Sequence, residues 1–214
     1  MNKPKRIRPK TRTAWLQQRK SGIGASECAA ILGLSPWMTA SELFEVKAGI
    51  KQPKDLSDNA DVQRGVRMEK ALRDLYKSQH PEYKVTHHPY DMLYQPEREW
   101  LFATLDGEIR DDTGRAGILE IKTAAPNGKA GWAKWNEKVP EAYACQIFHQ
   151  LAATGYEFVD LFAALINREN DMTIRTYHFE RSDYEEDIAY VVEKETEFWN
   201  SIQSRTIPPM TLMF

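Results

Sequence analysis

The chain has 214 residues and a net charge of −2, and 42% of its residues are hydrophobic and 11% aromatic. This composition excludes a disordered chain, and no apolar run is long enough to cross a membrane. No signal peptide is visible, and two cysteines, Cys28 and Cys145, cannot supply a four-thiolate zinc or iron–sulfur site. We expect a globular protein of the reducing cytoplasm.

Basic charge is concentrated at the N-terminus. Residues 1–20 hold eight lysines and arginines and no acidic residue, whereas the rest of the chain carries 21 basic and 31 acidic residues. We expect residues 1–12 to form a basic arm, residues 13–208 a single domain and residues 209–214 a tail. Two interpretations of the arm remain open, a disordered solvated segment or a contact with the phosphate backbone of DNA.

The first predicted helix covers Thr13–Lys20, and Ser21–Ala25 is a break of small residues. Ser26 precedes the run Glu27–Leu32, which predicts a helix with Ser26 as its N-cap. A helix start behind a glycine-containing loop is also a ready anion site, and Arg19 lies where it could join such a site. Helix capping and anion binding both remain open for Ser26.

Two further helices are predicted over Ser41–Ala48 and Val62–Ser78, separated by a polar loop over 49–61. The second helix has an apolar stripe with Glu69 inside it. A carboxylate on a core-facing surface needs a partner or a metal, because an unpaired buried charge is costly. An ion pair with an arginine is the ordinary explanation, and membership of an acidic site is the alternative. The stripe consists of Val62, Val66, Leu72 and Tyr76.

Two amphipathic segments, Leu101–Ile109 and Ile118–Lys122, are predicted to be neighbouring strands that follow a strand over Pro89–Tyr94. Asp111–Gly114 is a turn signal between them, and a hairpin centred near Thr113 places Asp106 opposite Glu120. Glu120 and Lys122 share one face, while Leu119 and Ile121 form an apolar underside against helices.

Opposed carboxylates repel unless a positive charge lies between them. Hard oxygen ligands at this spacing suit Mg²⁺ or Mn²⁺, and Lys122 adds a compact positive charge. Asp106, Glu120 and Lys122 therefore predict a metal-dependent nuclease site. Such a site lowers the pKa of a bound water and stabilises charge on the leaving oxygen. On spacing alone, a solvated strand face or a cross-strand ion pair remains an open alternative.

The C-terminal half continues with a basic and aromatic segment over 129–138, for which core packing of the tryptophans and DNA contact are both open. Pro140 opens a helix through Thr154, and strands are predicted over Phe158–Asn167 and Met172–Phe179. A capping box from Ser182 to Glu185 starts the last helix, whose acidic face is expected to be solvated. The helix after Pro140 carries a polar stripe that suggests a face over a site, made of Tyr143, Gln146, His149 and Gln150.

An ordered series of motifs resembles one family closely. The chain is similar to the phage lambda exonuclease group, the YqaJ-type viral recombinase or alkaline exonuclease branch of the PD-(D/E)xK nuclease superfamily, over about residues 15 to 200. It departs from the superfamily pattern because no proline precedes Asp106. The motifs are Arg19 with Gly22-Ile23-Gly24-Ala25-Ser26, Leu32-Gly33-Leu34-Ser35-Pro36, Glu69, Leu105-Asp106-Gly107, Leu119-Glu120-Ile121-Lys122 and Tyr143-x-x-Gln146.

The resemblance implies an α/β fold with a central mixed β-sheet flanked by helices, the restriction-endonuclease-like core. It implies a Mg²⁺-dependent exonuclease, with Mn²⁺ as an alternative metal, that degrades one strand of linear double-stranded DNA from the 5′ end and leaves 3′ overhangs for recombination by strand annealing. A ring-shaped homotrimer, a single-strand annealing protein as partner, and a cytoplasmic location in a bacterial host or as a phage product are further implications.

In the family pattern, Asp106, Glu120 and the backbone carbonyl of Ile121 bind metal, with Glu69 beside them. Lys122 orients or activates the attacking water. The 5′-phosphate is held by Arg19, Ser26 and Gln146, with Thr104 as a further candidate. A structure-specific or site-specific endonuclease of the same superfamily and a non-catalytic DNA-binding subunit remain alternative functions.

Overall fold

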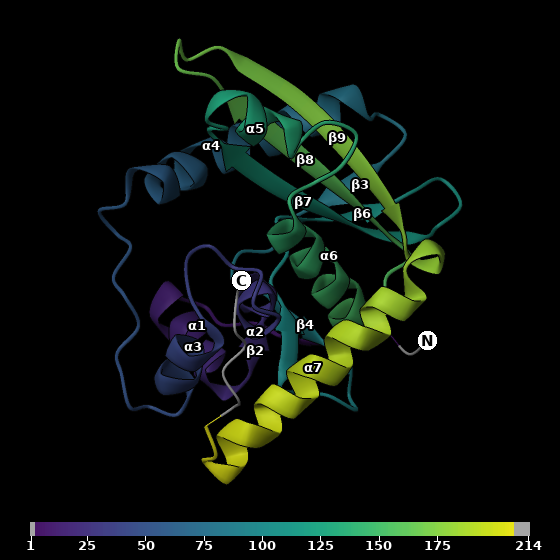
Figure 1. Cartoon of the computed structure of the whole chain (residues 1–214). Coiled ribbons are helices and arrows are strands. Elements are labelled where there is room, and N and C mark those ends of the chain that lie inside the picture. The colour runs from purple at the N-terminus through teal and green to yellow at the C-terminus, as the bar shows by residue number, and fades with distance from the viewer. Residues whose placement is uncertain (1–2, 208–214) are drawn as a thin grey trace.

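Two mixed β-sheets with helices packed on both form the framework of the protein (Figure 1). The structure is a computed structural model that describes residues 3–207, so the predicted tail over 209–214 lies outside the described residues. The larger sheet has the strand order β3-β6-β7-β8-β9, and the smaller sheet has the order β1-β4-β5-β2. The strands are β1 (Lys5–Ile7), β2 (Ile23–Gly24), β3 (Lys84–Thr86), β4 (Met92–Tyr94), β5 (Leu101–Ala103), β6 (Gly107–Arg110), β7 (Ala116–Ala124), β8 (Phe158–Ile166) and β9 (Met172–Glu180).

Helices cover both faces of the larger sheet. On one face, Leu72 and Tyr76 of α4 pack with Leu119 and Phe162. On the other face, α6 packs against the opposite side chains of β7 and β8, and α7 lies along α6 (Figure 1). This layering confirms the predicted α/β class. The α-helices are α1 (Arg12–Gln18), α2 (Cys28–Ile31), α3 (Ala40–Lys47), α4 (Ala60–Gln79), α5 (Gly128–Ala133), α6 (Glu141–Thr154) and α7 (Glu185–Ser204).

The hairpin of β6 and β7 has the predicted register. Gly107 pairs with Leu119, and the turn after Arg110 closes with Gly114 at a φ of 86°, a conformation that favours glycine. Extending this register by one residue places Asp106 beside Glu120, as the turn signal predicted. β7 then runs parallel to β8, with α5 and α6 in the crossover between them.

The predicted continuous strand over Leu101–Ile109 is wrong, because the segment forms two strands in different sheets. β5 pairs with β2 and β4, and β6 pairs with β3 and β7. The residues Thr104–Asp106 turn between the sheets. Side chains replace strand pairing there, since Asp106 Oδ2 accepts the backbone N–H of Ile121 and Arg73 Nε donates to the carbonyl of Asp106.

Part of the N-terminal arm forms a strand. Lys5–Ile7 forms β1 at the edge of the smaller sheet, antiparallel to β4. Arg6 bridges two acids, with its guanidinium 2.8 Å from Asp91 Oδ2 and 2.7 Å from Glu108 Oε1. The charge of Arg6 is therefore matched within the protein.

Helix α4 confirms the predicted span but only half of the predicted stripe. Leu72 and Tyr76 are buried, whereas Val62 and Val66 are 42% and 70% exposed. In Figure 1 the first turns of α4 project past the larger sheet and only the later turns pass behind it. Those early turns have no sheet to cover, so their apolar residues remain in solvent.

Two predicted helix starts are also wrong. Ser26 is not an N-cap, because Glu27 reaches back to the N–H of Gly24 and starts a 3₁₀ turn, Ala25–Glu27, before α2. At α7 the predicted capping box is absent, since Glu185 pairs with Arg181 at 2.9 Å instead. The acidic face of α7 is not wholly solvated either, because Glu195 is buried.

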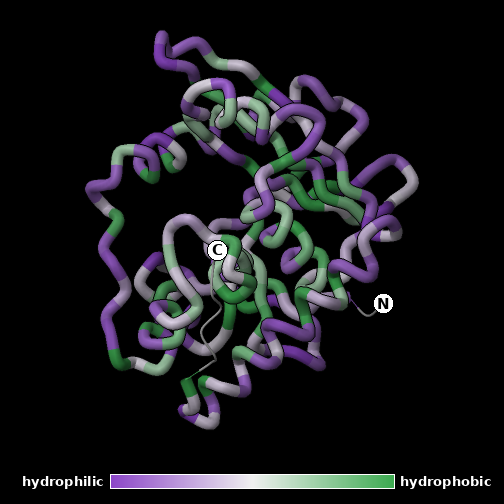
Figure 2. The backbone as a smooth tube through the Cα atoms, in the orientation of Figure 1, coloured by the Kyte–Doolittle hydropathy of each residue, from purple (hydrophilic) through white to green (hydrophobic). Residues whose placement is uncertain are grey.

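Hydropathy follows the layers. Figure 2 shows hydrophobic segments along the strands of the larger sheet and along α6, while the predicted loop between α3 and α4 is largely hydrophilic. Trp135 is buried in the largest core cluster, which supports the core-packing interpretation for this tryptophan. Among residues 3–207, no helix combines the length and apolar character that a membrane span requires.

Candidate active site

A pocket of about 630 Å³ gathers side chains from α1, α4, α6, β7 and the turn between β5 and β6. Every residue that the sequence nominates for catalysis, metal binding or substrate binding lines this pocket. These residues are Arg19, Ser26, Glu69, Thr104, Asp106, Glu120, Ile121, Lys122 and Gln146. The fold therefore brings together residues that lie up to 127 positions apart, from Arg19 to Gln146.

Glu120 is a buried acid of this pocket, with 3% of its surface exposed. Its Oε1 accepts Gln146 Nε2 at 2.6 Å and lies 2.6 Å from Lys122 Nζ. Its Oε2 accepts Gln150 Nε2 at 2.5 Å. Two glutamines of one helix face thus offset much of the cost of burying this carboxylate.

Asp106 stands beside Glu120 at the end of β6. Its Oδ2 accepts the N–H of Ile121 at 2.8 Å, which fixes the carboxylate against β7. Burial raises the pKa of Asp106 well above its usual value, and the negative charges of Glu120 and Glu69 raise it further. The charged form of Asp106 is consequently disfavoured until a cation neutralises the cluster.

Glu69 forms the ion pair with an arginine that its position in α4 left open, and its membership of a metal site stays a prediction. It pairs with Arg73 one turn later, and it also lines the pocket near Asp106. Arg73 in turn donates through Nε to the backbone carbonyl of Asp106 at 2.6 Å. Arg73 therefore holds Glu69 and the Asp106 backbone in a fixed relationship.

Lys122 places its ammonium group among these acids. Nζ donates to Gln146 Oε1 at 2.9 Å and lies 5.2 Å from the ring centroid of Tyr143. Burial alone would lower the pKa of Lys122, but the charges of Glu120 and Asp106 outweigh it and raise the pKa. Lys122 is therefore a charged group at neutral pH.

The donor chemistry fits a hard divalent cation. Asp106 and Glu120 offer carboxylate oxygens at adjacent positions, and a third carboxylate, Glu69, is held nearby by Arg73. Within residues 3–207, no three His, Cys, Asp or Glu side chains are gathered closely enough to form a complete metal site by themselves. A cation held here would need oxygen ligands from the backbone, from water or from substrate in addition.

Arg19, Ser26 and Thr104 line the same pocket, and the guanidinium of Arg19 lies 3.6 Å from Glu27 Oε1. Arg19 lies 3.4 Å from Ser26 Oγ, and its guanidinium stacks over the ring of Trp15 at 4.9 Å. The indole N–H of Trp15 donates to Thr104 Oγ1 at 3.1 Å. This part of the pocket offers a guanidinium and two hydroxyls, which suit a phosphate group. The polar groups at this place are side chains and not a helix N-terminus, because α2 has only four residues and Ser26 precedes it.

Lys47 fixes the backbone beneath Arg19. Its buried ammonium donates to the carbonyls of Arg19 at 3.0 Å and Gly22 at 2.6 Å, and it pairs with Glu27 at 2.7 Å. Gly22 is required there, because a Cβ atom would lie 2.2 Å from the carbonyl oxygen of Trp100. The loop that carries Arg19 is therefore held tightly against β5.

Sequence reasoning missed several residues that shape this pocket. Arg73 and Lys47 gave no signal, since they look like ordinary charged residues of amphipathic helices. Gln150 belonged to the polar stripe of α6, but its role as a donor to Glu120 became visible only with the register of β7. His149 of the same stripe faces away from the pocket and pairs with buried Glu195.

Comparisons with known proteins identify the family of the chain. A family model described as the YqaJ-like viral recombinase domain matches residues 14–157. The uncharacterized protein YqaJ of Bacillus subtilis (strain 168) is 30% identical over 190 residues, which cover 89% of this chain and 56% of that protein. The chain thus spans little more than half the length of this curated relative.

Solved structures share the fold. The alkaline exonuclease LHK-Exo from Laribacter hongkongensis superposes with a TM-score of 0.68 at 22% identity, covering 91% of this chain and 94% of that chain. Its complex with dAMP gives a TM-score of 0.69 at 23% identity with the same coverage. A phage related exonuclease from Haemophilus somnus 129PT gives 0.55 at 12% identity, covering 86% of this chain and 96% of that chain. On the strength of the family match over residues 14–157, this chain belongs to the YqaJ-like viral recombinase domain family.

Proposed function

We propose that this chain is a Mg²⁺-dependent deoxyribonuclease that degrades one strand of linear double-stranded DNA from its 5′ end. The observation that carries the proposal is one pocket in which an acidic pair with a partly buried lysine lies together with a guanidinium and hydroxyl cluster. The first group suits phosphodiester hydrolysis, and the second suits a terminal phosphate. The exonuclease names of the structural neighbours support the same class of reaction.

The residues divide into distinct roles. Asp106 and Glu120, with the carbonyl of Ile121, would hold the cation, and Glu69 would lie beside it. When bound, Mg²⁺ lowers the pKa of a water molecule and stabilises charge on the leaving oxygen, and Mn²⁺ is able to do the same. Lys122 orients the attacking water through its ammonium group and offsets negative charge that develops on the phosphate.

The 5′-phosphate is held by Arg19, Ser26 and Thr104. Gln146, the further phosphate ligand, lines the same pocket, and its side chain is anchored in the acidic part of the site, because its amide donates to Glu120 and its carbonyl oxygen accepts Lys122. Binding of a terminal phosphate beside the cleavage site supports attack from a 5′ end, since the anchored nucleotide is then the one released.

The resemblance to the recombinase group supports three further parts of the proposal. The product is a 3′ overhang for recombination by strand annealing, a single-strand annealing protein receives that overhang, and a homotrimeric ring encloses the DNA. We place the reaction in the cytoplasm of a bacterial host.

Digestion of an end-labelled linear duplex, with and without Mg²⁺, tests the proposal. We expect loss of the strand from its 5′ end only when Mg²⁺ is present, a faster reaction with 5′-phosphate than with 5′-hydroxyl ends, and no cleavage of covalently closed circular DNA. The variant Lys122→Ala should lose about 10²- to 10⁴-fold in rate, as expected for loss of a proton-transfer or charge-stabilising group.

The control is Lys70→Ala, which removes an exposed lysine that pairs with Asp74 on α4. Cleavage of covalently closed circular DNA would show that the chain is an endonuclease of the same superfamily and not an exonuclease. DNA binding without Mg²⁺-dependent cleavage would show that it is a non-catalytic DNA-binding subunit.

A further inference from the structure

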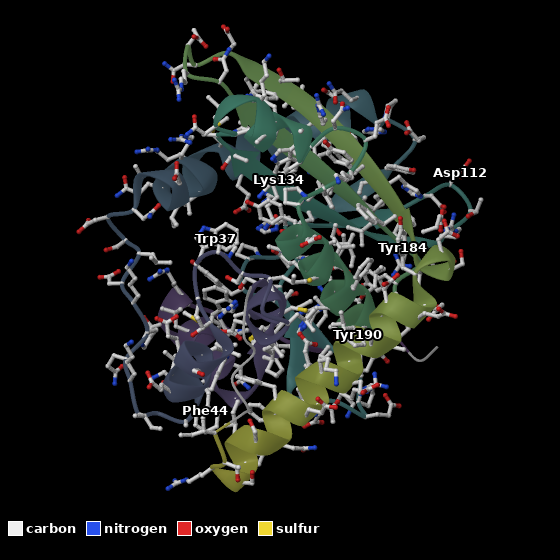
Figure 3. The ribbon with its side chains drawn as sticks, viewed as in Figure 1. Trp37, Phe44, Asp112, Lys134, Tyr184 and Tyr190 are labelled. Carbon is white, nitrogen blue, oxygen red and sulfur yellow. The ribbon has the colours of Figure 1, made fainter. Side chains whose placement is uncertain are left out.

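Trp37 is an exposed aromatic residue on the loop between α2 and α3. Its exposed fraction is 69%, unusually large for a tryptophan, and Figure 3 shows its label between the first turns of α4 and the N-terminal helices. Tryptophan buries about 150 to 250 Å² when it is packed in a protein. Most of that apolar surface remains in water here.

The loop that presents Trp37 is tied down at both ends. Ser35 Oγ accepts the backbone N–H groups of Trp37 at 3.2 Å and Met38 at 3.3 Å. Before it, the N–H of Leu34 donates to the carbonyl of Ala29 at 2.8 Å, and after it, Thr39 caps α3. Since the backbone is fixed on both sides, the exposure of Trp37 is a property of the fold and not of a loose segment.

Aromatic contacts connect Trp37 to the pocket. Its ring lies 6.0 Å from that of Tyr143, at an interplanar angle of 35°. Tyr143 lies 5.4 Å from the buried ring of Trp135 and also has Lys122 Nζ 5.2 Å from its centroid. The ring of Tyr143 therefore lies between Trp37 and Lys122 of the candidate active site, and the ring of Trp135 packs against Tyr143.

A rigid, flat and apolar surface at this place fits an unstacked nucleobase. Every base has a π-face, so an aromatic side chain binds single strands without selecting their sequence. Bases inside a duplex are stacked on their neighbours and offer no free face. The bases of a frayed or single-stranded segment do offer one.

We propose that Trp37 stacks on a nucleobase of a single-stranded nucleic-acid segment that leads to or from the pocket. This inference rests on the proposed function, because that function places a DNA strand at Lys122. It adds a base-binding position outside the phosphate and cation sites.

Binding of a 5′-phosphorylated single-stranded oligonucleotide in EDTA tests the inference without hydrolysis. A series of oligonucleotides carries one abasic site, moved along the strand base by base. For the wild-type protein we expect one position at which the abasic site weakens binding on the order of 5- to 150-fold, the range found when an aromatic residue that stacks on a base is replaced by alanine.

The variant Trp37→Ala should bind the intact strand with a similarly reduced affinity and should no longer respond to the abasic site at that position. Trp37→Phe keeps a ring and should retain the response. The matched control is Tyr190→Ala, which removes an exposed ring from α7, far from Trp37 in Figure 3, and should behave as the wild type.

Three results would overturn the inference. The first is equal affinity of wild type and Trp37→Ala for the intact strand, and the second is an abasic response that persists in Trp37→Ala. The third is a changed sedimentation mass of Trp37→Ala with an unaltered abasic response, which would assign the Trp37 surface to contacts between copies of the chain. Parallel digestion with Mg²⁺ reports the proposed function separately, so an inactive wild-type protein that keeps the Trp37-dependent response would refute the nuclease alone.

Discussion

Gln150 and Glu120 meet across the boundary of α6 and β7, where the buried glutamine amide donates to Glu120 Oε2 at 2.5 Å. Together with Gln146 on Oε1, this contact leaves both oxygens of the carboxylate with a protein donor. The orientation of Glu120 is therefore set by the protein before any cation or DNA is present.

Replacing Gln150 with leucine should destabilise the protein. Gln150→Leu keeps the approximate volume but removes a donor from a buried carboxylate, which costs about 1 to 3 kcal/mol in free energy of unfolding. Denaturant unfolding measures this difference. The exposed Gln203→Leu on α7 serves as the control and should change little, and a Gln150→Leu protein as stable as the wild type would show that water replaces the lost donor.

Asp106→Asn should stabilise the metal-free protein while removing activity. Burial and the charges of Glu120 and Glu69 raise the pKa of Asp106, so stability associated with its protonated form is lost as pH rises through that raised pKa. The asparagine Oδ1 still accepts the N–H of Ile121 but carries no charge. Thermal unfolding at neutral pH in EDTA should show a higher midpoint for the variant, and a lower midpoint would contradict the charge argument.

The buried pair of His149 and Glu195 should give stability that declines with rising pH. His149 Nδ1 lies 2.7 Å from Glu195 Oε1, and Nε2 lies 2.9 Å from the carbonyl of Phe102. Burial alone lowers the pKa of His149, but Glu195 and this carbonyl raise it above 6.5. The stabilisation is complete below about pH 6.5 and is lost as pH rises through the folded-state pKa.

Glu195→Gln should accordingly cost about 3 to 5 kcal/mol near pH 6, because it leaves the buried imidazolium without a counter-charge. The cost should shrink at higher pH, where the wild type loses the same pair. Unfolding free energies measured from pH 6 to pH 9 check this trend. The exposed His88→Gln is the control, and a cost for Glu195→Gln that does not vary with pH would mean that His149 is neutral in the folded protein.

Lys47→Met should reduce the preference for 5′-phosphorylated ends. Lys47 holds the carbonyls of Arg19 and Gly22 and the carboxylate of Glu27, so its loss frees the loop that positions the Arg19 guanidinium. We expect the ratio of digestion rates on 5′-phosphate and 5′-hydroxyl ends to fall on the order of 10-fold, equivalent to about 1.4 kcal/mol.

The control for this prediction is Lys51→Met, which removes an exposed lysine that lies 3.9 Å from Glu45. Circular dichroism melting establishes that Lys47→Met is folded before rates are compared. An unchanged ratio of the two rates in the folded variant would show that Lys47 does not contribute to recognition of the 5′-phosphate.

Local chemistry made the acidic pair predictable. The turn residues before Gly114 specify a hairpin, and strand alternation then fixes which side chains of β7 face Asp106. The same alternation correctly assigned Leu119 and Ile121 to the opposite face, where they pack with residues of α4. These features depend on contacts between neighbours in sequence, which a pattern of residue types records.

The features that sequence did not reveal depend on distant elements. The break between β5 and β6 arises from hydrogen bonds made by Arg73 and Ile121, neither of which is near Thr104 in sequence. The exposure of Val66 depends on where the sheet beneath α4 ends. A helical stripe shows which residues share a face but not how far the covering surface extends.

The turn between β5 and β6 also places the two parts of the pocket on one short stretch of chain. Thr104, which accepts the indole N–H of Trp15, and Asp106, beside Glu120, are separated by a single residue, and two backbone steps span at most about 7 Å. Under the proposed roles, this covalent spacing fixes the distance between the anchored end of a strand and the bond that is cut. The number of residues between Thr104 and Asp106 would then determine the length of the released fragment, and inserting a residue after Thr104 would change the size of the product.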